Sequence, residues 1–349
     1  MHSAERNPLV PLAEAQGLAI DRSKTPWRGQ YRELGFSRDE QTEAYEAFAA
    51  FDQAVAAPQP GDVASGALVP DGRWNAFVDA LSGYLNGTSL PHMSAADYAA
   101  YSDASSMNNW RVRSGYGALV ASLSDGLRIE QDCAVREVQW DGAHVRLSSD
   151  RGSIAAERAI VAVSSAVLAS GAIRFFPAVD DHLQAAAQLP LGHVEKLFFS
   201  LDQAEEFPND AHLIGDPRRI DTGSYMLQPV GLPVVECFFG GDWVAKASAS
   251  SLEDLARSEL GKLLGSAFDR RIRRIAASGW KDDPLFGGSY SYAVPGAHGS
   301  RRTLAQPVGG RLAFAGEACS EVDFSTVHGA WQSGIAAVAA LFGEAKDAR

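Results

Sequence analysis

One segment near the end of the chain, residues 310–334, constrains the fold more than any other. An apolar run of strand length, Leu312–Ala315, stops at Gly316-Glu317; a short polar loop follows, and a helical stretch begins near Thr326. The first backbone N–H groups of a helix have no partner within it and carry partial positive charge, so a helix start suits an anionic group of a ligand. A glutamate at the end of such a strand can accept hydrogen bonds from ribose or diol hydroxyls. The segment predicts a strand, a ligand-facing turn and a helix; taken alone, it would favour a strand and a helix that merely pack together.

The chain before this segment is predicted to be helical at first and rich in strands later. Ser37 and Glu40 form a capping box before an amphipathic helix, and Gly87 ends a second helix. Later elements are a helix over 118–124, strands over 134–140, 143–148, 159–163, 194–201 and 287–292, further strands within 225–239, and a helix over 251–264 capped by Ser251 and Asp254. The turn at Asp141-Gly142 creates a strand excursion that leads into a buried parallel strand, an order typical of flavoproteins with two dinucleotide-binding domains.

Composition and charge exclude several classes of protein. Lys and Arg number 31 against 43 Asp and Glu, a formal net charge of −12, which argues against a nucleic-acid partner. No apolar run approaches the roughly 18 residues that span a bilayer, and the first residues do not have the pattern of a signal peptide. The three cysteines form no C-x-x-C, and the eight histidines have no metal-ligand spacing. We therefore expect a cytoplasmic protein without a metal site, membrane span or disulfide framework.

Four segments together resemble the flavin-containing amine oxidases, the family of monoamine and polyamine oxidases and the lysine-specific histone demethylase. They are residues 115–120, 189–196, 288–292 and 310–334, and their order and spacing agree with the family over nearly the whole chain. The resemblance implies an α/β fold of mixed α+β character. It has an incomplete FAD-binding Rossmann-like domain of the p-hydroxybenzoate hydroxylase-like type and a substrate domain of a mixed sheet plus helices.

The resemblance also implies where the two domains lie along the chain. Residues 1–12, 112–190 and 287–349 would form the truncated FAD-binding domain, and residues 13–111 and 191–286 the substrate-binding domain. Both domains would be discontinuous.

The cofactor-binding residues implied by the resemblance are Val135, Gly316, Glu317, Thr326 and Val327. Val135 would meet the adenine end of FAD through its backbone, and Gly316 with Glu317 would hold the ribose or diphosphate region. Thr326 and Val327 would begin a helix that faces the pyrimidine edge of the flavin ring, where N–H donors stabilise negative charge on the reduced ring.

The catalytic residues implied in the same way are Lys196, Tyr290 and Thr326. Lys196 corresponds to the family lysine that holds a water against flavin N5. Tyr290 corresponds to one wall of the aromatic box that guides the amine, and Thr326 stands where monoamine oxidases have the second tyrosine. Ser289 occupies the place of their flavin-linking cysteine, so the resemblance implies non-covalent FAD and the polyamine-oxidase and demethylase branch. Tyr292 would share the strand face of Tyr290 by its period of two, although plain packing is the better interpretation of Tyr292.

One expected motif is absent from the sequence. The family begins with a strand, a G-x-G-x-x-G turn and a helix that seat the FAD diphosphate, and this pattern occurs nowhere among the 33 glycines. We therefore expect that the chain starts after the family's first βαβ unit and that FAD binding is lost or depends on a missing segment.

The functional prediction is an FAD-dependent amine oxidoreductase acting on a small-molecule amine by hydride transfer to flavin N5, incomplete as this chain. Two alternatives stay open. The chain could be a non-catalytic remnant that acts as a binding or assembly module, or one subunit of a two-chain flavin oxidase whose partner chain supplies the N-terminal FAD-binding unit.

Overall fold

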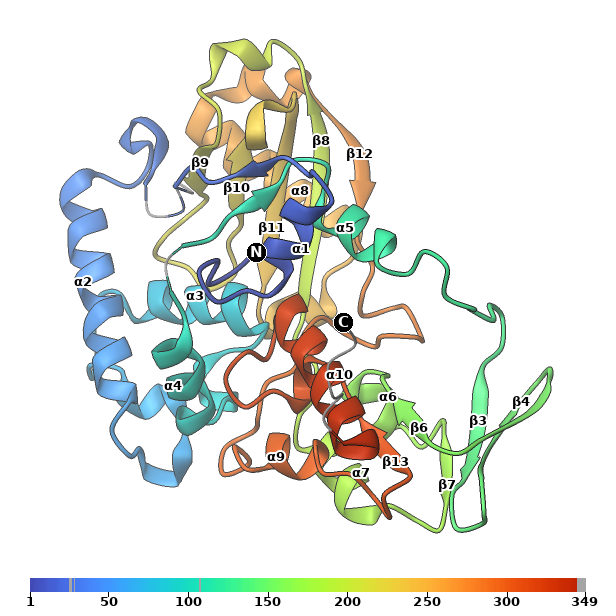
Figure 1. Cartoon of the computed structure of the whole chain (residues 1–349). Coiled ribbons are helices and arrows are strands. Elements are labelled where there is room, and N and C mark those ends of the chain that lie inside the picture. The colour runs from blue at the N-terminus through green and yellow to red at the C-terminus, as the bar shows by residue number, and fades with distance from the viewer. Residues whose placement is uncertain (25–26, 28, 107, 344–349) are drawn as a thin grey trace. The chain divides into compact units, whose positions relative to one another are not determined.

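Segments far apart in the sequence come together in two separate units (Figure 1). The computed structural model describes residues 1–24, 27, 29–106 and 108–343. Unit 1 comprises Met1–Arg22, Asp103–Leu191 and Pro284–Arg349, and unit 2 comprises Ser23–Ser102 and Gly192–Asp283.

Unit 1 combines short strands with helices from three parts of the chain. Its elements are α1 (Leu9–Ala15), β1 (Ile20–Asp21), β2 (Arg111–Val112), α5 (Tyr116–Ser122), β3 (Val135–Gln139), β4 (Val145–Ser149), β5 (Gly152–Ala156), β6 (Ala159–Val161), α6 (Ser165–Ala169), β7 (Arg174–Phe176), α7 (Asp180–Ala187), α9 (Ser300–Leu304), β13 (Leu312–Phe314), η9 (Glu317–Cys319) and α10 (Val327–Phe342). The strand excursion forms a four-stranded sheet in the order β5-β4-β3-β7, in which β3 and β7 are parallel.

A second sheet of unit 1 carries the closing segment of the chain. Within the described ranges it has only two strands, β13 and β6, which pair in parallel with Ala313 opposite Ile160. Leu312 and Phe314 point to the main core of the unit, whereas Ala313 and Ala315 pack against α10. Parallel sheets are normally larger and covered on both faces, so this pair is unusually small for its type.

The helix α10 is apolar around most of its circumference. Ala337 and Leu341 are buried against β13, but Ile335, Val338 and Phe342 are exposed to 55%, 48% and 57%. These three residues recur at helical spacing and form what we call the outer stripe of α10. The helix α10 is drawn in red in Figure 1, and the outer stripe belongs to its C-terminal half.

Unit 2 is built around one antiparallel sheet of five strands in the order β12-β8-β11-β10-β9. Its elements are η1 (Tyr31–Glu33), α2 (Arg38–Val55), η2 (Pro60–Asp62), η3 (Ala64–Ala67), α3 (Asn75–Asn86), η4 (Leu90–His92), α4 (Ala95–Ala104, which ends just past the boundary), β8 (Val194–Leu201), η5 (Ala204–Glu206), β9 (Ala211–Ile214), β10 (Ser224–Leu227), η6 (Pro229–Gly231), β11 (Val234–Gly240), η7 (Asp242–Lys246), α8 (Ala249–Leu264), η8 (Ser266–Arg271) and β12 (Ile272–Ala277).

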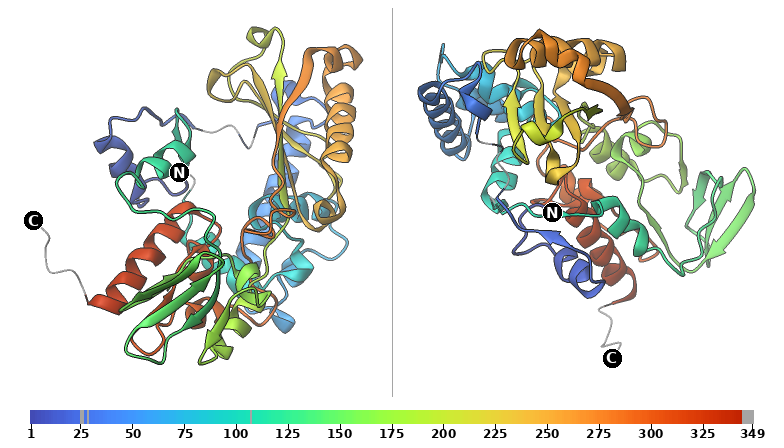
Figure 2. Two further views of the ribbon diagram at one scale, coloured as in Figure 1. Left: turned by 90° about the vertical axis from the view of Figure 1, so that its right-hand side faces the viewer. Right: turned by 90° about the horizontal axis from the view of Figure 1, so that it is seen from above.

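The strand β8 shows why this sheet has two different faces. Its residues alternate, so that Leu197, Phe199 and Leu201 enter a core shared with Leu252, Ala256 and Leu260 of α8, while Lys196 points to the opposite face. Figure 2 shows the long α8 lying along the sheet. The predicted strand over 194–201 is confirmed with these bounds.

Several predicted element bounds were wrong. Residues 287–292 form no strand; Ser291 makes only an isolated bridge to Leu191. Consequently Tyr290 and Tyr292 share no strand face. The strand predicted over 159–163 ends at Val161, because the Ser164 side chain accepts a hydrogen bond from Val167 N–H and begins α6.

Two helix starts also differ from the prediction. The α8 helix starts at Ala249, capped by a reciprocal Ser248–Ser251 pair rather than by Ser251 and Asp254. The α5 helix spans Tyr116–Ser122, two residues earlier than expected, since Gly115 with φ 95° turns the chain directly into it.

Candidate functional site

The Glu317 carboxylate joins two of the predicted site segments within unit 1. Its Oε1 accepts a hydrogen bond from Ser291 N–H (3.0 Å), and its Oε2 accepts from Ser291 Oγ (2.9 Å) and Ser325 N–H (2.7 Å). Ser291 follows Tyr290, and Ser325 precedes Thr326 at the start of α10. Glu317 therefore links the segment that contains Tyr290 to the segment that leads into Thr326, and we call this connection the Glu317 hub.

A buried arginine, Arg301, binds Ser291 of the Glu317 hub. The Arg301 guanidinium is fully buried, donates to Ser291 Oγ (2.9 Å), and lies over the ring of Phe324 with 3.6 Å between Cζ and the ring centroid. Burial raises the pKa of Glu317, and the nearby Arg301 charge opposes this shift. Because three donors already bind its oxygens, Glu317 has a structural role in fixing the two segments, with or without a ligand.

Thr326 uses its side chain to cap α10. Its Oγ1 donates to the carbonyl of Asp323 (2.6 Å) and accepts from Gly329 N–H (3.0 Å). The N–H groups of Val327 and His328, in the same first turn, have no hydrogen-bond partner among the residues that the structure describes. Any ligand contact of this turn is therefore through backbone donors and not through the threonine hydroxyl.

An ion-paired cluster fixes the turn before α10. Arg6 donates both Nη atoms to the Asp323 carboxylate (2.6 and 2.5 Å), and buried His328 approaches the same carboxylate with Nε2 at 3.0 Å. Burial alone would raise the pKa of Asp323, but the hydrogen bonds of His328 and Arg6 outweigh it and lower that pKa to about 2.

Two further features near the Glu317 hub bear on ligand binding. The Ser289 Oγ is buried and has no hydrogen-bond partner within the described part of the chain. Gly316 has φ 139°, which favours glycine, and apart from its own chain neighbours no described atom lies within 4 Å of the place a Cβ would take. Both its N–H and its C=O bind Ser333 Oγ of α10 (2.9 Å each), so the turn is held in place.

Three other predicted residues are not among those that bind Glu317. Val135 begins β3 opposite Ser149 and is half-buried. Lys196 belongs to unit 2, where its N–H donates to Ser278 Oγ (2.7 Å). Tyr292 is half-buried, and its N–H donates to the carbonyl of Pro190 (3.1 Å).

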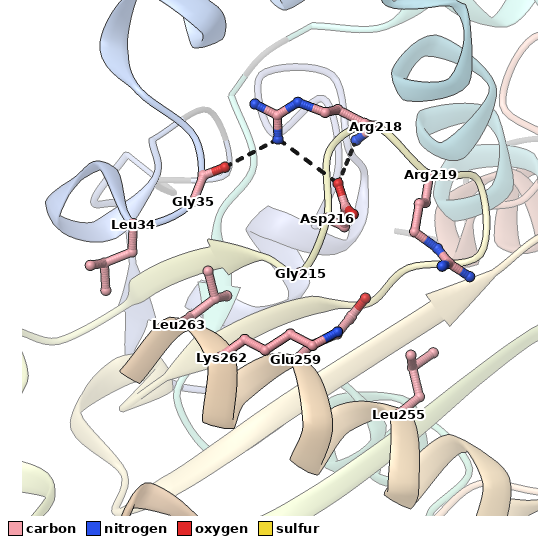
Figure 3. Close-up of a pocket in the computed structure, with 10 residues that line it drawn as sticks. All are labelled: Leu34, Gly35, Gly215, Asp216, Arg218, Arg219, Leu255, Glu259, Lys262 and Leu263. Carbon is pink, nitrogen blue, oxygen red and sulfur yellow. Dashed lines mark hydrogen bonds and ion pairs between the residues drawn. The ribbon is translucent and has the colours of Figure 1, made fainter. Parts of the chain in front are cut away.

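A hollow of about 410 Å³ in unit 2 contains none of the predicted site residues (Figure 3). Glu259 lies among its lining residues and accepts hydrogen bonds from Thr222 Oγ1 (2.8 Å), Gly223 N–H (3.0 Å) and Tyr225 OH (2.5 Å). Burial raises the pKa of Glu259. A Cβ at Gly215 would fall 2.0 Å from the Glu259 carboxylate, so this group pins the β9–β10 loop tightly against α8.

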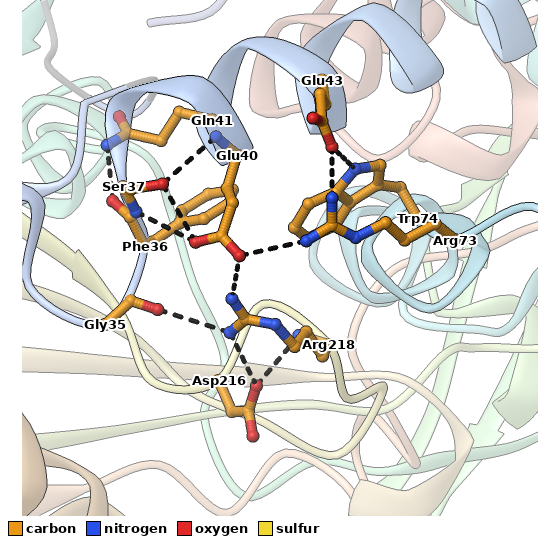
Figure 4. A network of polar contacts seen from close by, with 10 residues as sticks. All are labelled: Gly35, Phe36, Ser37, Glu40, Gln41, Glu43, Arg73, Trp74, Asp216 and Arg218. Carbon is orange, nitrogen blue, oxygen red and sulfur yellow. Dashed lines mark hydrogen bonds and ion pairs between the residues drawn. The ribbon is translucent and has the colours of Figure 1, made fainter.

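A network of charges at the rim of this hollow is also structural. Glu40 accepts from Arg218 and from Arg73 (3.2 Å), and Arg73 also donates to Glu43 (2.6 Å) (Figure 4). Arg218 reaches Gly35 O and Asp216 as well. The network ties α2 to the loop after β9, and its cations are already paired.

In the described residues no group of three or more His, Cys, Asp and Glu side chains could hold a metal ion. The helices of the same residues include none with the length and apolarity to cross a membrane.

Comparison with known proteins defines the class of protein to which this fold belongs. The model of the flavin containing amine oxidoreductases matches residues 12–342, and this chain belongs to that family. It is 29% identical over 280 residues to polyamine oxidase 1 of Oryza sativa subsp. japonica, covering 64% of this chain and 55% of that protein. It is 28% identical over 238 residues to lysine-specific histone demethylase 1 homolog 3 of the same organism, covering 63% of this chain and 29% of that protein.

Solved structures agree on the fold. Putrescine oxidase bound to putrescine superposes with a TM-score of 0.74 at 16% identity, and cyclohexylamine oxidase from Brevibacterium oxydans IH-35A with 0.71 at 19% identity. Each comparison covers 95% of this chain and 84% of the solved chain. The chain spans 53–58% of the length of three polyamine oxidases it matches. The predicted family, fold class and cofactor class are confirmed.

FAD is the cofactor of this family, so the residues of this chain can be compared with what FAD requires. The orphaned Ser289 Oγ, the open space at Gly316 and the unpaired N–H groups of Val327 and His328 fit a polar ring system with acceptor atoms. For the diphosphate end, the sequence offers no G-x-G-x-x-G turn.

Sequence reasoning missed four residues on which the hub depends, namely Ser291, Arg301, Asp323 and Arg6. The sequence could have indicated Ser291, since it is a small polar residue between two tyrosines in the family-like segment 288–292. Arg301 and Arg6 had no such signal, because their partners lie 10 and 317 residues away in sequence and come close only in the fold.

Proposed function

We propose that this chain supplies the flavin-ring and amine-binding residues of an FAD-dependent amine oxidase that acts on a small aliphatic amine by oxidative deamination. When bound, FAD would accept a hydride from the carbon beside the amine nitrogen. Unit 1 would act as the truncated FAD-binding domain and unit 2 as the substrate-binding domain. The observation that carries the proposal is the Glu317 hub, which fastens the Tyr290 segment to the open first turn of α10.

Each proposed site residue has a defined task. The N–H groups of Val327 and His328 would stabilise negative charge at the pyrimidine edge, because donors fixed at a helix start need no reorganisation. Gly316 would let the cofactor approach the backbone closely, and Glu317 would hold the geometry of both segments. Tyr290 would orient the amine, and Lys196 would hold a water by its ammonium group.

The amine class follows from the relatives and from charge. Polyamine oxidases are prominent among the related sequences, and a structural neighbour was solved with putrescine. The net charge of −12 favours a cationic amine over an anionic substrate. We propose a diamine or polyamine as substrate.

The test is titration of the purified chain with FAD, followed by amine-dependent hydrogen peroxide production. Lys196→Met is expected to slow turnover by roughly 10²-fold, the usual cost of losing one positioned donor. Lys262→Met is the matched control, since Lys262 is an exposed lysine of unit 2. Equal turnover of wild type and Lys196→Met would refute the role of Lys196, and flavin binding without any amine turnover would favour a non-catalytic binding module.

A second feature supports dependence on a further segment. The β13–β6 pair and the outer stripe of α10 together offer an unextended parallel sheet and an exposed apolar helix face. We propose that a strand-and-helix segment carrying a G-x-G-x-x-G turn, in the same or a separate chain, extends this sheet and completes the FAD site.

Coexpression with the N-terminal βαβ segment of a polyamine oxidase tests this dependence. The expected result is copurification of the segment and stoichiometric flavin absorbance that the chain alone does not give. Stoichiometric flavin in the chain purified alone would overturn the dependence and leave the oxidase proposal standing.

A further inference from the structure

The side chain of Lys196 is held on the sheet face by a carboxylate of the neighbouring strand. Lys196 Nζ lies 2.5 Å from Glu236 Oε1. Lys196 stands opposite Phe238 in the β8–β11 register, and Glu236 is two residues before Phe238, so the ion pair is diagonal across the two strands. Both side chains keep access to solvent, with 39% and 28% of their surface exposed.

An aromatic ring covers a second side of the Lys196 ammonium. Nζ lies 5.0 Å from the ring centroid of Phe238, within the range of a cation–π contact. The Phe238 ring stacks on Tyr84 of α3, with centroids 5.6 Å apart and planes at 29°. Tyr84 OH donates to the carbonyl of Thr222 (2.8 Å), which anchors the stack.

The backbone at Lys196 is clamped as well. Lys196 N–H donates to Ser278 Oγ (2.7 Å), Ser278 N–H donates to the carbonyl of Lys196 (2.9 Å), and Ser278 Oγ also donates to buried Glu195 on the other face of β8. With its backbone and its ammonium both fixed, Lys196 is preorganised in a way that an ordinary surface lysine is not.

We propose that Glu236 is the positioning residue of Lys196: it neutralises and aims the ammonium so that a cationic amine can approach the site without repulsion. This inference rests on the proposed function, in which Lys196 holds a water beside the reacting amine. An ammonium has three donors, and Glu236 occupies one while Phe238 covers a second direction. The third remains for the water.

The charge of Glu236 distinguishes this role from simple stabilisation of the sheet. An uncompensated Lys196 ammonium would repel an amine that carries positive charge, whereas the Lys196–Glu236 pair is neutral overall. Removing only the negative partner should therefore weaken binding of a cationic substrate more than it slows its conversion.

The first test needs neither flavin nor substrate. The chain and its Glu236→Gln variant are treated with an amine-acylating ester, and the modification rates of Lys196 and exposed Lys262 are followed by peptide mass spectrometry. We expect Lys196 to react about threefold faster or more in Glu236→Gln, as loss of a partly exposed ion pair implies, with no change at Lys262. Glu236→Asp should stay near the wild type, and Glu205→Gln, at an exposed glutamate of the same unit, serves as the matched control.

The second test uses the FAD-loaded protein. Glu236→Gln is expected to raise KM for a diamine several-fold with a smaller change in kcat, and added salt should reduce the difference. Glu236→Asp should restore KM in part.

The outcomes of the two tests are separable from those of the proposed function. An unchanged acylation rate of Lys196 in Glu236→Gln would overturn the inference, as would a fall in kcat with KM unaltered. If the acylation result holds while Lys196→Met leaves turnover intact, Glu236 still positions Lys196, and only the catalytic role of Lys196 fails.

Discussion

Glu317 shows how one side chain can set the geometry of two segments. Its two oxygens face three donors from Ser291 and Ser325, and it has Arg301 nearby. An amide at this position would place N–H groups against backbone N–H groups. The carboxylate is therefore required even by the fold of the site, before any ligand binds.

We accordingly expect Glu317→Gln to destabilise the chain by about 1–3 kcal/mol, the cost of leaving buried donors unsatisfied. Urea unfolding measures this change. The control is Glu321→Gln in the same loop, where the exposed Arg302 pair should contribute less than about 1 kcal/mol. Equal effects of the two substitutions would contradict the importance given to the hub.

Asp323 adds a pH-dependent contribution. Its pKa is lowered from 3.8 to about 2, so its stabilising effect is complete above pH 4 and is lost as the pH falls from about 4 to about 2. A shift of this size corresponds to about 2 kcal/mol. Asp323→Asn should remove that amount of stability at pH 7 and reduce the dependence of the free energy of unfolding on pH below pH 4. Urea unfolding at several pH values measures both effects. An unchanged pH dependence in the variant would show that Asp323 is not the titrating group.

At the scale of elements, the start of α10 depends on its cap. Thr326→Ala is expected to cost about 1 kcal/mol, because Gly329 N–H loses its acceptor, and Thr326→Ser should recover most of it. Thermal unfolding of the three proteins provides the measurement. If serine were as damaging as alanine, packing of the threonine methyl group and not the cap would be the cause.

Elements governed by local signals could be predicted from the sequence. The capping box at Ser37 and Glu40 and the helix end at Gly87, in the left-handed region with φ 71°, follow from neighbouring residues alone. The bounds of β8 follow from the alternation of its side chains. Residues 287–292 have the composition of a strand, but a strand needs a partner, and only Ser291 finds one in Leu191.

The residues of the candidate site likewise differ in whether the local sequence indicates them. Glu317 and Thr326 can be selected from the motif around them, and the cap of Thr326 is local, but the bonds of Glu317 to Ser291 span 26 residues. Arg301, Arg6 and Glu236 become visible only when the chain folds, since each meets its partner through a tertiary contact or a strand register that the sequence does not encode locally.

At the scale of the whole molecule, the two units contain groups that titrate in different ranges. Burial lowers the pKa of His212 in unit 2 to about 4, and the ring approaches Gly29 O and Ser224 Oγ with its two nitrogens (3.2 and 2.9 Å). A histidine with a lowered pKa stabilises the fold fully above about pH 6.5 and loses that effect as the pH falls toward 4. Asp323 of unit 1 acts only below this range.

We therefore expect acid unfolding to proceed in two stages, with unit 2 weakening between pH 6.5 and 4 and unit 1 between about 4 and 2. Tryptophan fluorescence and hydrogen exchange resolved by peptide would assign each stage to its unit. His212→Gln should diminish the first stage and leave the second in place. A single transition below pH 4 in the wild type would show that His212 does not limit the stability of unit 2.

The outer stripe of α10 has a consequence for the fate of the chain in a cell. Ile335, Val338 and Phe342 present an apolar helix surface to water, the kind of surface that chaperones bind and degradative proteases use to recognise unassembled subunits. Covering the stripe would remove that signal. Under the proposal that a further segment covers α10, the lifetime of this polypeptide would then report how much of it is assembled with that segment.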